Sequence, residues 1–250
     1  LRDLTRRTGA PVICANLTDP SGRLLFPGTR LVTVSGVRVG VLALLGERLD
    51  LGPARDSLRV TDPEAAAQAA VADLRARGAQ VVVLLSQLGK AGGEDLAFAV
   101  PGIDVVFLGH EVPMIDAARR VGDALALYTG EQGQHAGLVT VDLSSGVAVG
   151  DGAVRVLGPD LREDQPVLAD VKRFEDAYNE RMREYQRRLD ALAAADPEQD
   201  PVDHFVGGAV CARCHADEAS QWRTTAHSLA WETLVREKKD STPDCIPCHV

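Results

Sequence analysis

The sequence predicts an α/β fold for most of the chain, and three observations lead to that prediction. Hydrophobic residues make up 45% of the 250 residues and aromatic residues only 4%, which is typical of the aliphatic core of a sheet covered on both faces. Short Val-rich runs alternate with helical segments as far as Leu157. Some of these runs are joined through a helix, so we expect an at least partly parallel sheet layered with helices.

The apolar runs predict the strands in chain order. Gly, Pro, Asp or Ser residues bound each run, and several runs are apolar at consecutive positions, which suits strands that are buried on both faces. The expected strands are Pro11–Asn16, Leu31–Val34, Val37–Leu45, Gln80–Ser86, Ile103–Leu108, Ala124–Tyr128 and Leu138–Leu143.

Two helices are expected between these strands. An Ala-rich segment runs from Asp62 to Arg77; an Asp before its start, a Pro in its first turn and a Gly just past its end are common helix boundary signals. A shorter helix is expected at Gly93–Val100. The Gly-rich stretch 89–93 before it has no phosphate-binding pattern and is interpreted as a loop.

A long amphipathic helix is expected from Pro166 to about Ala195, followed by a linker with two prolines, Asp196–Pro201. The helix either packs one stripe on a neighbour or self-associates as a coiled coil. We therefore expect a sheet domain at residues 1–160, a helix and linker at 161–200, and a small module at 201–250. The apolar positions of the helix are Val167, Val171, Phe174, Tyr178, Met182, Tyr185, Leu189 and Leu192.

Two Cys-x-x-Cys-His motifs lie in the last part of the chain, which is too poor in aliphatic residues to build its own core. This motif is the attachment pattern of haem c: two thiols add to the vinyl groups, and the His binds the iron. We expect one haem on Cys211 and Cys214 with His215 as proximal ligand, and a second haem on Cys245 and Cys248 with His249 as proximal ligand.

A zinc site is the main alternative for the four cysteines, because two Cys-x-x-Cys pairs can form a four-thiolate tetrahedron. The His directly after both pairs favours haem over zinc. Disulfide bonds are a third alternative, weakened by the redox-active character of most two-residue Cys loops.

The segment Val206–Val250 resembles the multihaem c-type cytochromes of the tetrahaem electron-carrier kind. The resemblance rests on a Gly before the first motif, on both Cys-x-x-Cys-His motifs, and on the stretch Gln221–Ala230 between them. It implies at least two covalent haem c groups, electron transfer to redox protein partners, and a periplasmic or otherwise extracytoplasmic location. It also implies that His227 is a distal iron ligand; a surface or helix-capping His is the alternative.

The N-terminal part, about Pro11 to Leu143, resembles the 5′-nucleotidase type of the calcineurin-like metallophosphatases. The segments that carry the resemblance are Cys14–Leu17, Gly36–Val41, Val81–Gly89 and Pro101–His110. It implies hydrolysis by a hydroxide held between two divalent metal ions, with the first metal-binding motifs upstream of this segment.

The late metal ligands implied by that resemblance are mostly replaced. Gln87 stands where the family has a His after Leu-Leu-Ser, and Val112 stands where the family has His or Gln. His110 is retained as a candidate metal ligand; a partly buried His bonded to backbone is the alternative. No catalytic residue is identified, and we expect a degenerate domain. Cys14 is interpreted as a small buried hydrophobic residue.

The formal net charge of −9 argues against a nucleic-acid partner. The longest apolar stretch, Leu31–Leu45, is too short for a membrane helix, so any membrane association would involve segments outside this chain. The chain starts at Leu1 without a signal peptide and stops after a motif, so we expect a piece of a longer protein.

Three functional hypotheses follow. The first is an exported multihaem electron-transfer protein with a degenerate metallophosphatase-like domain. The second is a metal-dependent nucleotidase or phosphoesterase with an accessory haem tail. The third is a zinc-stapled binding module. Whether the chain is an enzyme stays open among them.

Overall fold

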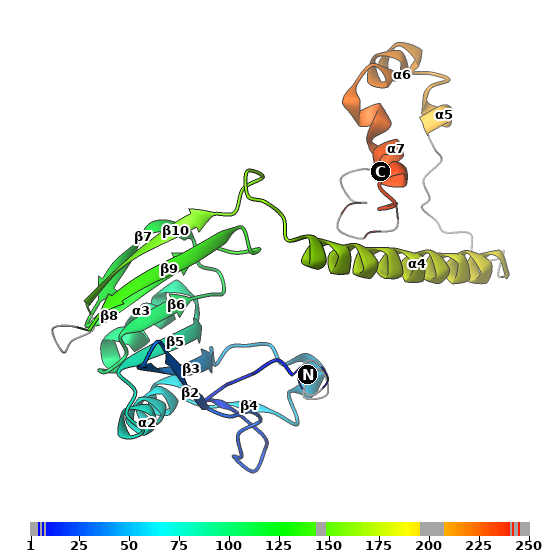
Figure 1. Cartoon of the computed structure of the whole chain (residues 1–250). Helices are drawn as coiled ribbons and strands as arrows, with labels where there is room; N and C mark the ends of the chain where they lie inside the picture. Colours follow the sequence, from blue (N-terminus) through cyan, green and yellow to red (C-terminus); the bar gives the residue numbers. More distant parts are fainter. Residues whose placement is uncertain are drawn as a thin grey trace. The chain divides into compact units, whose positions relative to one another are not determined.

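The computed structural model divides the chain into two compact units, Leu1–Leu161 and Arg162–Val250 (Figure 1). It describes residues 9–143, 149–195 and 208–240, together with Thr5, Arg7, Thr242 and Cys245. The second unit contains both the long helix and the cysteine-rich tail, so the three-part division expected from the sequence stays a prediction.

The first unit is built on a mixed sheet of eight strands in the order β2-β3-β5-β6-β8-β7-β10-β9. The inner strands β3, β5, β6 and β8 are parallel, and β2, β7, β9 and β10 pair antiparallel at the sides. The expected α/β fold with a partly parallel sheet is thus confirmed. The bounds are β2 Thr29–Val34, β3 Val37–Leu45, β5 Val81–Gln87, β6 Val105–Leu108, β7 Met114–Val121, β8 Ala124–Thr129, β9 His135–Asp142 and β10 Val149–Val156; β1 (Leu17–Thr18) and β4 (Arg59–Val60) form a separate pair.

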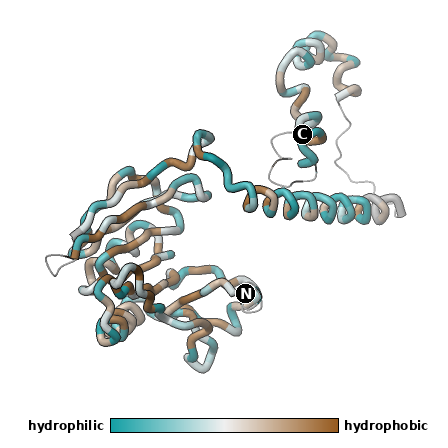
Figure 2. Tube along the Cα trace, viewed as in Figure 1, coloured by the Kyte–Doolittle hydropathy of each residue, from teal (hydrophilic) through white to brown (hydrophobic). Residues whose placement is uncertain are grey.

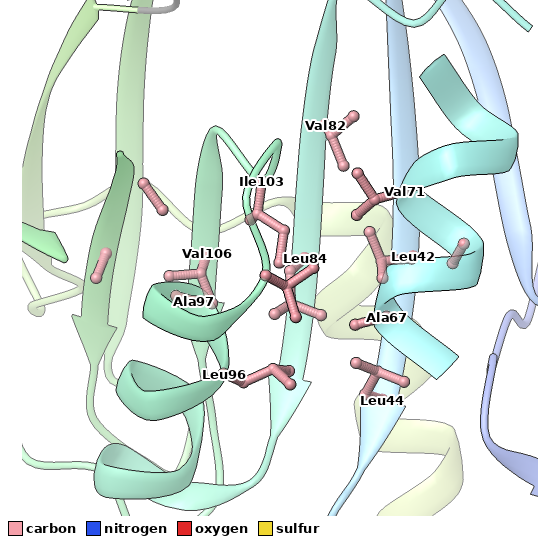
Figure 3. Packing of buried hydrophobic residues seen from close by; sticks show 14 of the residues in the cluster. Leu42, Leu44, Ala67, Val71, Val82, Leu84, Leu96, Ala97, Ile103 and Val106 are labelled. Atoms are coloured by element: carbon pink, nitrogen blue, oxygen red, sulfur yellow. The ribbon is translucent and has the colours of Figure 1, made fainter. Parts of the chain in front are cut away.

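Two helices, α2 (Pro63–Ala76) and α3 (Gly89–Ala99), pack on the parallel strands. Figure 3 shows Ala67 and Val71 of α2 against β3, and Leu96 of α3 beside β5 and β6. The strand side chains below them are fully buried, as at Leu42 and Val106. This aliphatic layer is the core that the low aromatic content predicts.

The start of α3 differs from the expectation, since residues 89–93 are helical and do not form a loop. A Cβ on Gly93 would lie 2.1 Å from Leu108 Cδ2 and 3.0 Å from Ser86 Oγ. Glycine therefore lets the helix backbone approach β5 and β6 closely. The Gly-rich composition reflects close packing, which composition alone does not distinguish from a turn.

The strand expected at Pro11–Asn16 is wrong. This segment makes single backbone bonds instead of a ladder: Cys14 N–H donates to Pro27 O and Ala15 N–H donates to Ala43 O, both at 2.9 Å. The sequence does not predict strand β7, because its side chains are mostly exposed and include several charged residues, which leaves no clear alternation.

A part-buried hydrogen bond links β8 to α3. Tyr128 is fully buried, and its hydroxyl donates to Glu94 Oε1 at 2.6 Å. The Arg119 guanidinium lies 5.9 Å from the centre of the Tyr128 ring. The bond from Tyr128 holds the pKa of Glu94 below its usual value, while burial raises the pKa of Tyr128.

The second unit begins with the long helix α4 (Gln165–Ala195), which confirms the amphipathic helix expected there. Asp164 Oδ1 accepts from the Val167 N–H at 3.1 Å and caps the helix start. Four short helices follow: α5 (Gly208–Cys211), α6 (Ala216–Arg223), η2 (Ala226–Leu229) and α7 (Ala230–Arg236). Among the described residues, none of the helices has the length and apolar character that crossing a bilayer requires.

The segment after α7 is anchored on α4 through Asn179, whose side chain is buried. Asn179 Nδ2 donates to Lys238 O at 2.7 Å, and its Oδ1 accepts from the Thr242 hydroxyl at 2.7 Å. An ion pair between Arg183 and Asp240 at 3.2 Å lies one turn along the helix. One buried amide thus attaches the end of the tail to the helix.

Replacing Tyr128 by Phe is expected to destabilise the first unit by about 1–2 kcal/mol at neutral pH, because the Glu94 carboxylate loses the hydrogen bond from the Tyr128 hydroxyl and keeps only that from Lys90. Since the pKa of Glu94 is lowered on folding, the bond stabilises the fold above the usual value of 4.5 and this stabilisation is lost as the pH falls through the lowered pKa. Urea unfolding followed by far-UV circular dichroism should therefore show a difference between Y128F and the unmodified chain that shrinks in acid. A difference independent of pH would contradict this; T33V, which removes an exposed hydroxyl on β2 of the same unit, is the control.

Replacing Asn179 by Ala is expected to weaken the anchoring of the tail by about 1–3 kcal/mol, since the two part-buried hydrogen bonds of its amide, to Lys238 O and from the Thr242 hydroxyl, are lost. Trp222 and Trp231 are the only two tryptophans of the chain and both lie in the tail, so their fluorescence during urea unfolding follows this unit. N179A should lower the midpoint of that transition, and D176A on α4 should not. An unchanged midpoint in N179A would rule out the anchoring role.

Candidate functional site

The first Cys-x-x-Cys-His motif forms a tight turn between α5 and α6. The N–H groups of Cys214 and His215 both donate to Cys211 O, at 3.2 and 3.0 Å. This turn places His215 directly before α6, as its N-cap residue. Both thiols are exposed and form no disulfide, so the turn presents two sulfurs and an imidazole within five residues.

A hollow of about 550 Å³ with mainly apolar walls lies against this turn. Cys211, His215, Ala219 and Trp222 are among the residues that line it. The Glu218 carboxylate lies 3.8 Å from Nδ1 of His215, so Nε2 is the ring nitrogen outside this contact. The hollow can therefore receive an apolar group that bonds to the Cys211 sulfur and to the His215 imidazole, whereas Cys214 is not among the residues that line it.

The described part of the tail has almost no core of its own. Leu234 is the one apolar residue there that is fully buried, whereas the larger apolar side chains are 41–54% exposed. A covalently attached haem would supply the apolar surface that these side chains need, so the residues present fit this group. The exposed side chains are Val210, Trp222, Leu229, Trp231 and Val235.

The other predicted haem residues are not brought to this hollow. His227 lies on η2 with an exposed side chain and does not line the hollow. Cys245 is half-buried, and its N–H donates to Thr242 O at 3.0 Å. Cys248 and His249 lie outside the described residues. Ligation by His227 and the second haem therefore stay predictions.

A second candidate site lies in the first unit, where β3, β5 and β6 end at one edge of the sheet. A cavity of about 840 Å³ opens there, lined by the loop Gly46–Asp50 and by Gln87, His110 and Glu111 among others. The carboxyl ends of parallel strands are the usual place for ligand sites in α/β folds.

The side chain of Gln87 forms part of the wall of this cavity and is held there by a hydrogen bond. Its Oε1 accepts from the Gly46 N–H at 3.3 Å, and this oxygen is the atom with which an amide would bind a hard metal ion. Val112 is buried and offers no donor atom. Two of the three late ligand positions implied by the sequence thus serve packing and loop structure.

His110 faces solvent at the edge of the cavity, and the partly buried histidine considered as an alternative is not what the structure has. His110 and Glu111 both have left-handed backbone conformations, with φ of 68° and 54°, and the Glu111 N–H donates to Glu131 Oε1 at 2.6 Å. Left-handed backbone conformations are unfavourable for residues other than glycine, so the surrounding structure must hold these two consecutive residues in place.

Across the described residues, no group of three or more His, Cys, Asp or Glu side chains could hold a metal ion. The described residues by themselves therefore do not fit a complete divalent metal site. His110 remains a candidate ligand whose partners would have to come from outside the described residues.

Asn16 does not line the strand-end cavity but holds the backbone beside it, a role that the sequence alone does not indicate. It is fully buried; its Nδ2 donates to Leu45 O at 2.8 Å and to Thr61 O at 3.0 Å, and its Oδ1 accepts from the Leu45 N–H at 2.9 Å. The signal in the sequence is an amide side chain inside an otherwise apolar segment, which indicates a buried polar group with specific partners. The neighbouring Cys14 is buried, which raises the pKa of its thiol, in keeping with a packing role.

Comparison with known proteins assigns the two units differently. The chain is 29% identical over 138 residues to the uncharacterized metallophosphoesterase YunD of Bacillus subtilis (strain 168), which covers 54% of this chain and 29% of YunD. Sulfate thiohydrolase SoxB of Thermus thermophilus matches with a TM-score of 0.61 and 27% identity over 68% of this chain and 33% of SoxB. A 5′-nucleotidase precursor, also from Thermus thermophilus, matches with a TM-score of 0.55 and 26% identity over 63% of this chain and 36% of that protein.

The N-terminal unit is metallophosphoesterase-like. This agrees with the resemblance to 5′-nucleotidases found in the sequence, and the whole chain spans about a third of the length of these relatives. The tail is matched by the family "Cytochrome c554 and c-prime" at residues 210–250, in agreement with the cytochrome resemblance. A metallophosphoesterase-like unit and a cytochrome c554-like tail thus occur in one chain.

Proposed function

We propose that the protein transfers electrons through haem c bound covalently to its tail. The apolar hollow lined by Cys211, His215 and Trp222 is the observation that carries this proposal. It places a thiol and an imidazole that can hold a haem beside apolar side chains that have no core to pack into. The cytochrome c554 match over the same segment supports it.

In this proposal the thiols of the two motifs hold two haems, with His215 and His249 as proximal ligands and His227 as a sixth ligand. Haem supplies one-electron redox chemistry when it is bound. The chain's own part is to bind the iron and to cover the ring with apolar side chains such as Trp222, which sets the redox potential. The partners are redox proteins, and the location is extracytoplasmic because haem c is attached after export.

The haem content tests this proposal in protein made in a host that matures c-type cytochromes. A pyridine haemochrome spectrum should show a c-type band, and intact mass should show at least two haems, one fewer in C211A/C214A and an unchanged number in C14A. Zinc without haem would establish the zinc-stapled module instead. Disulfide-linked tails without haem would also overturn the proposal.

Metal-dependent phosphoester hydrolysis by the N-terminal unit is the second candidate function. The comparisons give it the broader support, since metallophosphoesterase matches cover 54–68% of the chain and the cytochrome match only residues 210–250. The strand-end cavity with His110 favours the same function, whereas the committed amide of Gln87 and the buried Val112 oppose it.

Hydrolysis assays on the full-length protein separate the two candidates. Because the Gln87 amide is bonded to Gly46 and Val112 offers no ligand atom, the first proposal expects no hydrolysis of a nucleoside monophosphate or an aryl phosphate ester with added manganese. Hydrolysis that is abolished by a chelator, and is lowered at least about tenfold in H110A but not in Q68A on the exposed side of α2, would instead make the protein a phosphoesterase with a haem tail.

A further inference from the structure

The helix α4 carries an apolar stripe that the described residues of its own unit leave open. The side chains of this stripe are 36–69% exposed, apart from the half-buried Met182. Figure 2 shows apolar residues recurring along an otherwise hydrophilic helix. From residue 167 to residue 189 the stripe is about 33 Å long. Its members are Val167, Val171, Phe174, Tyr178, Met182, Tyr185 and Leu189.

The described part of the tail does not cover this stripe, because its contacts are on another side of the helix. Glu175, Asn179 and Arg183 make the contacts with the tail and lie one turn apart on one face. At about 100° per residue, the centre of the stripe lies about 100° around the helix from Asn179. A partner can therefore pack on the stripe while the tail stays anchored.

Apart from Val167, the stripe residues are nearly symmetric about residue 180. Positions 171 and 189, like 178 and 182, are centred on residue 180, and positions 174 and 185 are centred half a residue before it. When two copies of the helix cross antiparallel at this point, Val171 meets Leu189, Phe174 meets Tyr185, and Tyr178 meets Met182. Aliphatic residues then face aliphatic ones, and each tyrosine or phenylalanine meets a residue that packs well on a ring.

The charges beside the stripe select the same orientation. Asp170 and Arg188 lie on the same side of the stripe, with side chains 68% and 72% exposed. In the antiparallel arrangement, Asp170 lies opposite Arg188 of the second copy, and symmetry forms this pair twice. In a parallel arrangement, Asp170 would lie beside Glu175 of the second copy, and these like charges would repel.

From the symmetric stripe and these charges, we infer that α4 is a self-association surface, through which two copies of this chain pair antiparallel about residue 180. Within one chain, Asp170 pairs with Arg173 and Arg188 with Glu184. Because these pairs are exposed, they exchange for pairs between the chains at little cost.

Sedimentation velocity of the full chain over a range of concentrations tests the inference. The unmodified chain should form a dimer reversibly. D170R should raise the dimer Kd at least about threefold, since two like-charge pairs replace two opposite-charge pairs. R188D should do the same, and the double variant D170R/R188D should restore the original Kd.

Two controls keep this experiment decisive. D176R makes the same charge change on the opposite side of the helix and should leave the Kd unchanged. F174S removes a largely exposed stripe residue and should weaken the dimer, with the helix content by circular dichroism retained. A chain that stays monomeric, or a D170R effect equal to that of D176R, overturns the inference; a tighter D170R dimer establishes a parallel pair and overturns it too.

Discussion

The cavity of the N-terminal unit depends on one buried amide, that of Asn16. Its side chain joins the end of β3 to the segment that leads into α2, through three hydrogen bonds to Leu45 and Thr61. A buried amide without these partners would be costly, so the segments around it have little freedom to shift. The loop Gly46–Asp50 starts where Asn16 holds the backbone, and Gln87 then binds Gly46. The position of the cavity wall therefore depends on hydrogen bonds made in the interior of the unit.

The two units reach stability by different means. The first unit buries an aliphatic layer between α2, α3 and the parallel strands, with fully buried residues such as Leu42 and Leu84. The described tail buries only Leu234 and is attached to α4 through the amide of Asn179. This contrast explains why the N-terminal unit keeps the metallophosphoesterase fold although side chains at two ligand positions do other work. A fold rests on its core, whereas a site rests on a few side chains.

Much of the fold could be predicted from the sequence, because continuous apolar runs and clear helix boundary signals mark β3, β5, β8, α2 and α4. The failures have physical causes. The Gly-rich start of α3 resembles a loop in composition, although Gly93 is needed for contact with Leu108. Strand β7 lies mostly in solvent and lacks a period. At the sites, the motif around Cys211 is visible in one short segment, whereas the roles of Asn16 and Gln87 arise from contacts with residues about 30 or more positions away.

The position of Asn179 on α4 has a consequence for how electrons could travel between molecules. If two copies pair through α4 as proposed, Asn179 lies next to the two-fold axis, and the tail that it anchors is held at the same level in both copies. The two cytochrome-like tails would then be neighbours, whatever the placement of the other domains. If the tails also carry haem as proposed, an electron that enters through the tail of one molecule could leave through the tail of the other.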